Sequence, residues 1–243
     1  MRTDVARLVL TDEPFNVAIG GNVTDRDQRD FVMASRAMTD PQFLDFNQKW
    51  MDAVLPHLVD GGILGTFIDW RRWPMAQAAA TGLGLTPLDL VVWAKANPGM
   101  GNLYRSQHEL LPLFKKGTAS NANNISPGKR GRHRTNLWTY SGASSPGPDA
   151  RKGLQDHPTV KPTAMLQDAL IDLTNPGEIV LDPFLGSGST LIAAENTGRL
   201  CCGIELDPLY VDVIIRRYEA ETGAAAILAD TGETFEQIAT RKP

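Results

Sequence analysis

The chain has 243 residues, of which 42% are hydrophobic and 21% are charged, with 22 Gly, 16 Pro and 2 Cys. This composition is globular and excludes collagen-like, disulfide-scaffold and fully disordered proteins. The net charge is −4, no apolar run approaches the roughly 18 residues of a membrane span, and the N-terminus lacks the apolar core of a secretory signal. We therefore expect a cytoplasmic protein with no membrane partner.

The first half of the chain alternates short apolar runs with helical patterns. Residues 8–10 predict a buried strand that ends in the polar, proline-containing loop 11–15. The pair Asp40-Pro41 predicts the start of a helix, and the glycines at 61–62 predict its end. The following patterns predict strands over 63–68, 88–95 and 109–114, and a short helix over 74–81.

A long excursion over 117–157 then contains few aliphatic residues and many Ser, Asn, Gly, Pro and basic residues. Six basic residues and no acidic one lie between 115 and 134: Lys115, Lys116, Lys129, Arg130, Arg132 and Arg134. Without these six, 18 basic residues face 28 acidic ones, a net charge of −10. A basic segment on an acidic body is typical of a DNA-contacting loop on an enzyme, although a solvated loop has the same composition.

Regular patterns return after the excursion and alternate between strand and helix. They predict helices over 162–173, 189–198 and 208–222 and strands over 178–181 and 201–205. This βαβαβ order indicates an α/β fold with a mostly parallel sheet and helices on both faces. We treat residues 1–243 as one domain with an insertion at 115–157. Cys201 and Cys202 are neighbours in a predicted strand, so they point to opposite faces and are expected to be reduced; no metal site is expected.

The sharpest motif is a strand, a glycine turn and a helix over 179–190, which reads Ile-Val-Leu-Asp-Pro-Phe-Leu-Gly-Ser-Gly-Ser-Thr. Such a turn brings backbone N–H groups close to a ligand, because glycine has no Cβ. Glu205 follows 19 residues after Gly186, at the end of the next predicted strand. A carboxylate in this position accepts hydrogen bonds from ribose hydroxyls. These features favour an adenosine-containing ligand over a tight turn without one. Leu191 stands where a dinucleotide fingerprint needs its third glycine.

Three blocks of the chain resemble the exocyclic-amino DNA methyltransferases that use S-adenosylmethionine. They are residues 182–190, the His-Pro-Thr-Val-Lys-Pro block at 157–162, and residues 203–208. The resemblance implies a Rossmann-like methyltransferase fold, with motifs in the permuted, β-type order. It also implies a set of cofactor-binding residues: Lys161, Pro162, Asp182, Phe184, Gly186, Ser187, Gly188, Ser189, Glu205 and Asp207.

Asp12, Glu13, Pro14 and Phe15 stand where this family carries its catalytic Asp-Pro-Pro-Tyr. The Asp12 carboxylate and the Glu13 backbone carbonyl would each accept a hydrogen of the target amino group, and Phe15 would stack on the extruded base. Phe15 keeps the aromatic ring of the family tyrosine. Glu13 replaces a proline and adds a carboxylate beside the expected base pocket, which places the catalytic rate in question.

In the permuted order, the insertion at 115–157 reads the DNA, and Lys129, Arg130, Arg132 and Arg134 are its expected contacts to phosphates or guanine edges. His108 and Glu109 precede a strand, where they either shape the base pocket or are structural polar residues. The resemblance also suggests a homodimer, and it leaves two alternatives for the length of the protein: a compact version of these enzymes, or the methylase part of a longer protein with an N-terminal ParB-like domain.

The expected activity is methylation of adenine N6 in DNA, because Asp opens the catalytic tetrapeptide. The alternatives are a cytosine-N4 DNA methyltransferase, a silent DNA-binding protein that keeps the cofactor fold, and an RNA methyltransferase.

Overall fold

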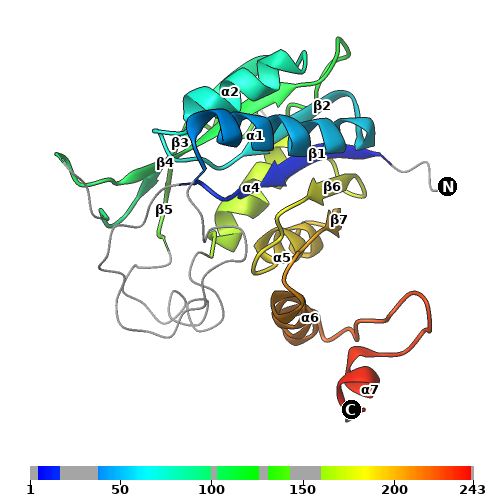
Figure 1. Cartoon of the computed structure of the whole chain (residues 1–243). Helices are drawn as coiled ribbons and strands as arrows, with labels where there is room; N and C mark the ends of the chain where they lie inside the picture. The colour runs from blue at the N-terminus through cyan, green and yellow to red at the C-terminus, as the bar shows by residue number, and fades with distance from the viewer. Residues whose placement is uncertain (1–4, 17–37, 100–102, 126–130, 143–159, 242–243) are drawn as a thin grey trace.

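A seven-stranded sheet forms the centre of the molecule (Figure 1). The computed structural model describes residues 5–16, 38–99, 103–125, 131–142 and 160–241, and within them the strand order is β5-β3-β4-β2-β1-β6-β7. Neighbouring strands pair in parallel except at β4, which runs antiparallel to both β2 and β3. The strands are β1 (Ala6–Thr11), β2 (Leu58–Thr66), β3 (Thr86–Lys95), β4 (His108–Lys115), β5 (Leu137–Tyr140), β6 (Ile179–Asp182) and β7 (Leu200–Gly203).

Helices cover both faces of this sheet, and the side chains of β1 alternate between them (Figure 1). Leu8 and Leu10 pack with α4 and α5, whereas Val9 packs with α1 and α2. Central strands are therefore apolar on both sides, as parallel strands between two helical layers require. The helical elements are α1 (Asp40–Val54), the 3-10 helix η1 (Leu55–His57), α2 (Trp73–Gly82), α4 (Thr163–Leu173), α5 (Ser189–Asn196), α6 (Pro208–Thr222) and α7 (Phe235–Ala239).

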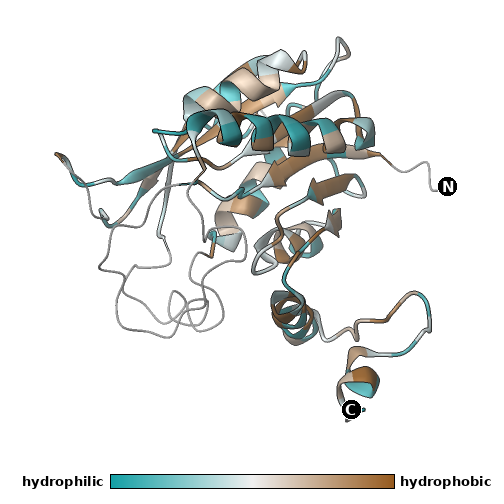
Figure 2. Ribbon diagram, viewed as in Figure 1, coloured by the Kyte–Doolittle hydropathy of each residue, from teal (hydrophilic) through white to brown (hydrophobic). Residues whose placement is uncertain are grey.

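The amphipathic character of α1 shows how its sequence places it on the sheet. Its buried residues recur at helical spacing, from Phe43 through Trp50 and Met51 to Val54. The visible outer side of the helix is largely hydrophilic, while β1, β6 and β7 are coloured hydrophobic (Figure 2). Burial of this apolar stripe fixes α1 over the strands that carry the site described below.

The chain connections run in opposite directions from β1 and from β6. From β1 the chain passes through α1 to β2 on one side, and from β6 it passes through α5 to β7 on the other side. β1 and β6 are therefore neighbours at the point where the strand order reverses. In open α/β sheets, ligands bind at such a point, outside the carboxyl ends of the strands.

The α/β fold with a mostly parallel sheet is confirmed, but the expectation that Gly61 and Gly62 end the first helix is wrong. The helix ends at Val54, because Pro56 lacks an N–H and its ring clashes with a helical turn before it. β2 already begins at Leu58 and contains both glycines. There its pairing with β1 shifts register, from Ala6 opposite Leu58 to Leu8 opposite Ile63.

The excursion over 117–157 is also more than a loop, because it supplies the edge strand β5. This strand pairs in parallel with β3 and buries Trp138 in the core. Its four residues, Leu-Trp-Thr-Tyr, are too short a run to stand out from the polar sequence around them. The connection expected over 20–38 lies almost wholly outside the described residues, as do 126–130 and 143–159. Within the described ranges no helix is both long and apolar enough to cross a membrane.

Candidate active site

Asp12, Glu13, Pro14 and Phe15 form the loop that leaves β1 at the carboxyl end of the sheet. The adjacent strand β6 ends at Asp182, and the Thr11 hydroxyl joins the two strand ends by donating to Asp182 Oδ1 over 2.6 Å. Thr11 and Asp182 are 171 positions apart in the sequence. The fold therefore brings the predicted catalytic loop and the predicted cofactor loop together at the carboxyl ends of β1 and β6.

Lys161 lies beside Asp12, just before α4. Its Nζ is 2.5 Å from Asp12 Oδ2 and 3.2 Å from Glu109 Oε2, while Lys95 of β3 binds Oε1 of the same glutamate. The side chains of Lys161 and Glu109 are only 9% and 13% exposed, so water screens these charges weakly. We call Asp12, Lys95, Glu109 and Lys161 the pocket cluster.

The charges of the pocket cluster shift one another's pKa values. Burial raises the pKa of Asp12, and the nearby Glu109 carboxylate adds to this, while Lys161 opposes both. Burial alone would lower the pKa of the Lys161 ammonium, but Asp12 and Glu109 outweigh it and the pKa is raised. Burial would raise the pKa of Glu109, but Lys161 and Lys95 hold it below its ordinary value. Lys161 is thus a cation at neutral pH, and Glu109 is an anion.

The aromatic side of the loop is equally close to Lys161. Its Nζ lies 5.2 Å from the ring centroids of both Phe15 and Phe67, within the range of a cation–π contact. Asn16 follows with a φ of 48°, a left-handed conformation that asparagine tolerates. The side chain of Asn16 makes two hydrogen bonds to the backbone of Met38, of 2.7 and 2.6 Å. The loop is therefore anchored immediately after Phe15.

The Glu13 side chain points away from this cluster and into the layer under α1. Glu13 is only 1% exposed, and its Oε2 accepts a 2.8 Å hydrogen bond from Trp50 Nε1. Burial raises the pKa of Glu13 to about 8, against the opposing hydrogen bonds from Trp50 and Thr66. The expected carboxylate beside the base pocket is therefore a buried group that ties the loop to α1.

At the end of β6, Asp182 is 3% exposed and anchors the start of the next loop. Its Oδ1 accepts from Thr11 and from the backbone N–H of Phe184, and burial raises its pKa to about 6. The Phe184 ring packs edge-on to Trp50, with centroids 5.6 Å apart. Trp50 therefore contacts both loops, because it also binds Glu13.

The glycine turn uses left-handed backbone at two positions. Gly186 has a φ of 54°, and Gly188, the residue before α5, has a φ of 77°. A Cβ on Gly188 would approach Ile214 of α6 to 3.0 Å, so this position needs glycine for space as well as for conformation. Arg217 of α6 holds the turn by donating to the Ser187 carbonyl over 2.9 Å and to the Ser189 hydroxyl over 3.0 Å.

Glu205 closes the same loop from the end of β7. Its two carboxylate oxygens accept the backbone N–H groups of Gly186, over 2.8 Å, and of Asp207, over 2.9 Å. Asp207 is the N-cap of α6, because its side chain accepts from Leu209 N. Each oxygen of Glu205 keeps acceptor capacity for a further donor.

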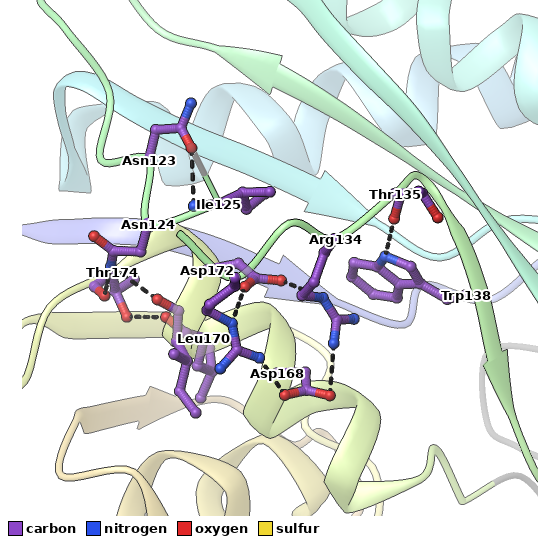
Figure 3. Close-up of polar contacts among 12 residues, drawn as sticks. Asn123, Asn124, Ile125, Arg134, Thr135, Trp138, Asp168, Leu170, Asp172 and Thr174 are labelled. Atoms are coloured by element: carbon purple, nitrogen blue, oxygen red, sulfur yellow. Dashed lines mark hydrogen bonds and ion pairs between the residues drawn. The ribbon is translucent and has the colours of Figure 1, made fainter. Parts of the chain in front are cut away.

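Two of the predicted DNA contacts, Arg132 and Arg134, bind carboxylates of α4. Figure 3 shows Arg134 beside Asp168 and Asp172. Arg132 lies 2.5 Å from Asp168 and 2.6 Å from Asp172, and Arg134 lies 2.7 and 2.8 Å from the same two residues. Tyr140 of β5 donates to Asp168. We call these five residues the staple cluster, because they fasten the inserted segment to α4. Lys129 and Arg130 lie outside the described residues, and DNA contact by all four basic residues stays a prediction.

The sequence patterns predict the two loops that the fold brings together, and they miss several residues that hold these loops. The structure places the Lys161 ammonium beside Asp12 and Pro162 directly before α4, and cofactor contact by these two residues stays a prediction. Sequence patterns do not single out Lys95, Trp50 or Arg217, because each meets the loops only through the fold. The one signal in the sequence is Glu109, an acidic residue at the start of an apolar strand, which is read there as either a pocket residue or a structural polar residue.

Comparisons with known proteins agree with this geometry. The profile of the DNA methylase family that acts on N6 and N4 amino groups matches residues 6–216. The type II methyltransferase M.HpaI of Haemophilus parainfluenzae is 24% identical over 229 residues, which cover 88% of this chain and 68% of the relative.

Solved structures share the fold. The M1.HpyAVI complex with S-adenosylmethionine superposes with a TM-score of 0.64 at 23% identity, covering 88% of this chain and 89% of the other. The cytosine-N4-specific PvuII DNA methyltransferase gives a TM-score of 0.67 at 17% identity, covering 88% and 79%. The chain belongs to the exocyclic-amino DNA methyltransferases, the family that methylates adenine N6 or cytosine N4 with S-adenosylmethionine.

Proposed function

We propose that this methyltransferase acts on the N6 amino group of adenine in DNA, with Asp12 as the catalytic acceptor. The observation that carries the proposal is the position of Asp12: it directly follows the carboxyl end of β1, where Thr11 is hydrogen-bonded to Asp182 at the end of β6 and the start of the glycine loop. Asp at the head of the tetrapeptide favours adenine, since Ser there more often accompanies cytosine N4 in this family. Cytosine N4 is the alternative target.

Methyl transfer to an exocyclic amino group needs two hydrogen-bond acceptors, one for each amino hydrogen. The lone pair of an exocyclic amino group is delocalised into the base, so the nitrogen is a poor nucleophile. Asp12 Oδ1 is buried and has no hydrogen-bond partner among the described residues, which leaves it to accept one amino hydrogen. The backbone carbonyl of Glu13 accepts the other. Both bonds favour a pyramidal nitrogen whose lone pair points at the methyl donor.

Phe15 is the stacking partner for the base in this proposal. The amino group cannot be reached inside a duplex, so the base must leave the stack, at a cost of a few kcal/mol. Stacking on an aromatic ring returns about 1–3 kcal/mol. The Phe15 ring is partly buried against the core and anchored by Asn16, so it offers a preformed surface.

The loop residues fit S-adenosylmethionine, which supplies an electrophilic sulfonium methyl group when bound. Gly188 precedes α5 without a side-chain cap, which leaves helix N–H groups available to a carboxylate. Glu205 offers oxygens to ribose hydroxyls, and Asp182 offers an acceptor to an ammonium group. The remaining residues of the proposed cofactor site are Pro162, Phe184, Gly186, Ser187, Ser189 and Asp207.

We further propose that segment 115–157 meets the DNA as the target-recognition insertion. The pairing of Arg132 and Arg134 with α4 favours a positioning role for these two, and leaves Lys129 and Arg130 as the phosphate-contact candidates. A homodimer and an additional ParB-like domain remain predictions from the family resemblance.

The test is incubation with isotopically labelled S-adenosylmethionine and unmethylated genomic DNA, followed by nucleoside digestion and mass spectrometry. Labelled N6-methyladenine is the expected product, and Asp12→Ala is the matched control that should give none. Labelled N4-methylcytosine would keep the mechanism and overturn the target. Absence of label in a sample that binds the cofactor would overturn the activity and favour a silent DNA-binding protein or a missing domain, and transfer to RNA in preference to duplex DNA would overturn the substrate.

A further inference from the structure

The Lys161 ammonium has one hydrogen-bond donor more than its carboxylate partners use. An ammonium carries three N–H donors. Asp12 Oδ2 accepts a hydrogen bond from Nζ over 2.5 Å, and Glu109 Oε2 lies 3.2 Å from Nζ as its second ion-pair partner within the described part of the chain. Even if Glu109 takes a second N–H, at least one N–H of this ammonium, which also lies 5.2 Å from the Phe15 ring centroid, is available to a ligand beside Asp12.

Asp12 has the complementary surplus. Its Oδ2 faces Lys161, while its Oδ1 is buried and accepts no hydrogen bond from any residue that the structure describes. A buried carboxylate oxygen without a partner costs free energy unless a ligand supplies a donor. One open donor and one open acceptor thus stand side by side, held by the direct contact between Lys161 and Asp12.

We propose that Lys161 is a base-reading residue that donates to the ring nitrogen next to the target amino group, while Asp12 accepts an amino hydrogen. This inference rests on the proposed function and deepens it. Adenine presents N1 as an acceptor beside its N6 amino donor, and cytosine presents N3 beside its N4 amino donor. Guanine and thymine present the opposite order, an N–H beside a carbonyl oxygen. The pair therefore selects amino-bearing bases without separating adenine from cytosine.

This role is one of orientation. A donor at the ring nitrogen draws electron density into the ring, so it does not make the amino group a better nucleophile. It fixes the edge of the flipped base so that the amino group meets Asp12. Glu109 and Lys95 hold the ammonium in place from the other side, because Glu109 binds both lysines.

The test removes one partner at a time, from the enzyme and from the base. Two duplexes are compared, each containing the methylation site that the genomic DNA experiment identifies. The target base is adenine in one duplex and 1-deazaadenine in the other, which keeps the amino group and replaces N1 by C–H. We expect wild-type enzyme to lose roughly 10- to 100-fold in kcat/KM on the deaza duplex, mainly through KM, because a hydrogen bond to a charged donor is lost. Lys161→Met should be poor on both duplexes and discriminate less than about 3-fold between them.

The cycle separates base reading from simple charge neutralisation. If Lys161 serves only as the counter-ion of Asp12, wild type and Lys161→Met will show the same ratio between the two duplexes, and the proposal is overturned. Lys95→Met is the matched control, because it removes an ammonium from the same cluster that does not touch Asp12, and it should keep the wild-type ratio. Lys161→Gln, which keeps an N–H donor, should retain part of the discrimination and serves if the methionine variant does not fold.

A binding measurement keeps the inference testable without turnover. If no DNA is methylated, the proposed function fails, and deoxyadenosine monophosphate is compared with its 1-deaza analogue by ligand-observed NMR in the presence of S-adenosylhomocysteine. Weaker binding of the deaza analogue to wild type, but not to Lys161→Met, supports the pairing. Equal binding of the two nucleotides to wild type overturns it.

Discussion

Two clusters in the described part of the chain set a pair of cations against a pair of carboxylates, and they differ in what they leave open. The staple cluster sets Arg132 and Arg134 against Asp168 and Asp172 and joins an inserted segment to α4. The pocket cluster converges from four separate elements on the carboxyl end of the sheet. Its Asp12 Oδ1 is buried with no hydrogen-bond partner among the described residues, whereas the two buried staple atoms without a hydrogen bond, Arg134 Nε and Asp172 Oδ2, face each other as an ion pair at 2.8 Å. The comparison teaches that a buried acceptor with no group set against it distinguishes a site from a fastening.

The strongest way to break this comparison is Asp12→Ala. Loss of the acceptor should lower kcat by roughly 100- to 1,000-fold or more, as removal of a preorganised catalytic group does. Cofactor affinity, measured by calorimetry, should stay within several-fold of wild type, because Asp182 and Glu205 hold the cofactor loop. Asp168→Asn in the staple cluster is the control and should keep kcat. A comparable loss of cofactor binding in Asp12→Ala would place Asp12 in the cofactor site or the fold.

Glu13 sharpens the comparison because it is a buried carboxyl group that belongs to neither cluster. Its pKa is raised from 4.5 to about 8, whereas the two lysines lower that of Glu109. Between pH 4.5 and about 8, Glu13 is protonated in the folded state and ionised in the unfolded chain. The free energy of unfolding therefore falls as pH rises from about 5 to about 8. Since each pKa unit corresponds to about 1.4 kcal/mol, a few kcal/mol are at stake across this range.

Glu13→Gln should remove this contribution of Glu13 to the pH dependence of the free energy of unfolding. Urea unfolding across the same pH range should show the variant gaining on wild type as pH rises, with the smallest difference near pH 5. Parallel stability curves for the two proteins would mean that Glu13 is ionised in the fold, contrary to this account. Trp50→Phe, which removes the hydrogen-bond donor to Glu13, should destabilise the protein most at high pH, where the carboxylate needs that donor.

Much of the site could be predicted because its residues follow a strand end or a glycine turn in the sequence. Asp12 directly follows an apolar run, and Asp182, Gly186 and Gly188 form one continuous motif, so local pattern and function coincide. Glu205 was found by its spacing after Gly186. These positions depend on backbone geometry that neighbouring residues set.

Side-chain direction could not be predicted in the same way. Glu13 lies between two predicted pocket residues and yet turns toward Trp50, since only the packed fold shows which side of the loop α1 covers. The basic run containing Arg132 and Arg134 suggests DNA, because the acidic residues that pair with them come 34 to 40 positions later. Charge patterns along a sequence do not reveal partners on another element.

Glu205→Ala tests a carboxylate that neutral N–H groups hold without a cation. Loss of its ribose contacts should raise the cofactor Kd by roughly 10-fold, the value of one or two hydrogen bonds. Glu205 also accepts from Gly186 and Asp207, so part of the effect is a looser turn. Glu205→Gln, which keeps acceptor capacity, should recover part of the affinity in the same titration. Unchanged binding in Glu205→Ala would remove this residue from the ribose role.

The smallest effect on function is expected where the staple cluster is opened from either side. Arg132→Gln with Arg134→Gln should lower the free energy of unfolding by about 1–3 kcal/mol, and Asp168→Asn with Asp172→Asn should do the same, because each pair leaves the other uncompensated. Salt dependence of DNA binding then separates fastening from phosphate contact. Each lost phosphate contact reduces the slope of log affinity against log salt by about 1. We expect neither double variant to change the slope, whereas Lys129→Gln with Arg130→Gln should flatten it. A flatter slope in the arginine pair alone, with tighter binding in the aspartate pair, would show that Arg132 and Arg134 leave α4 for the DNA backbone.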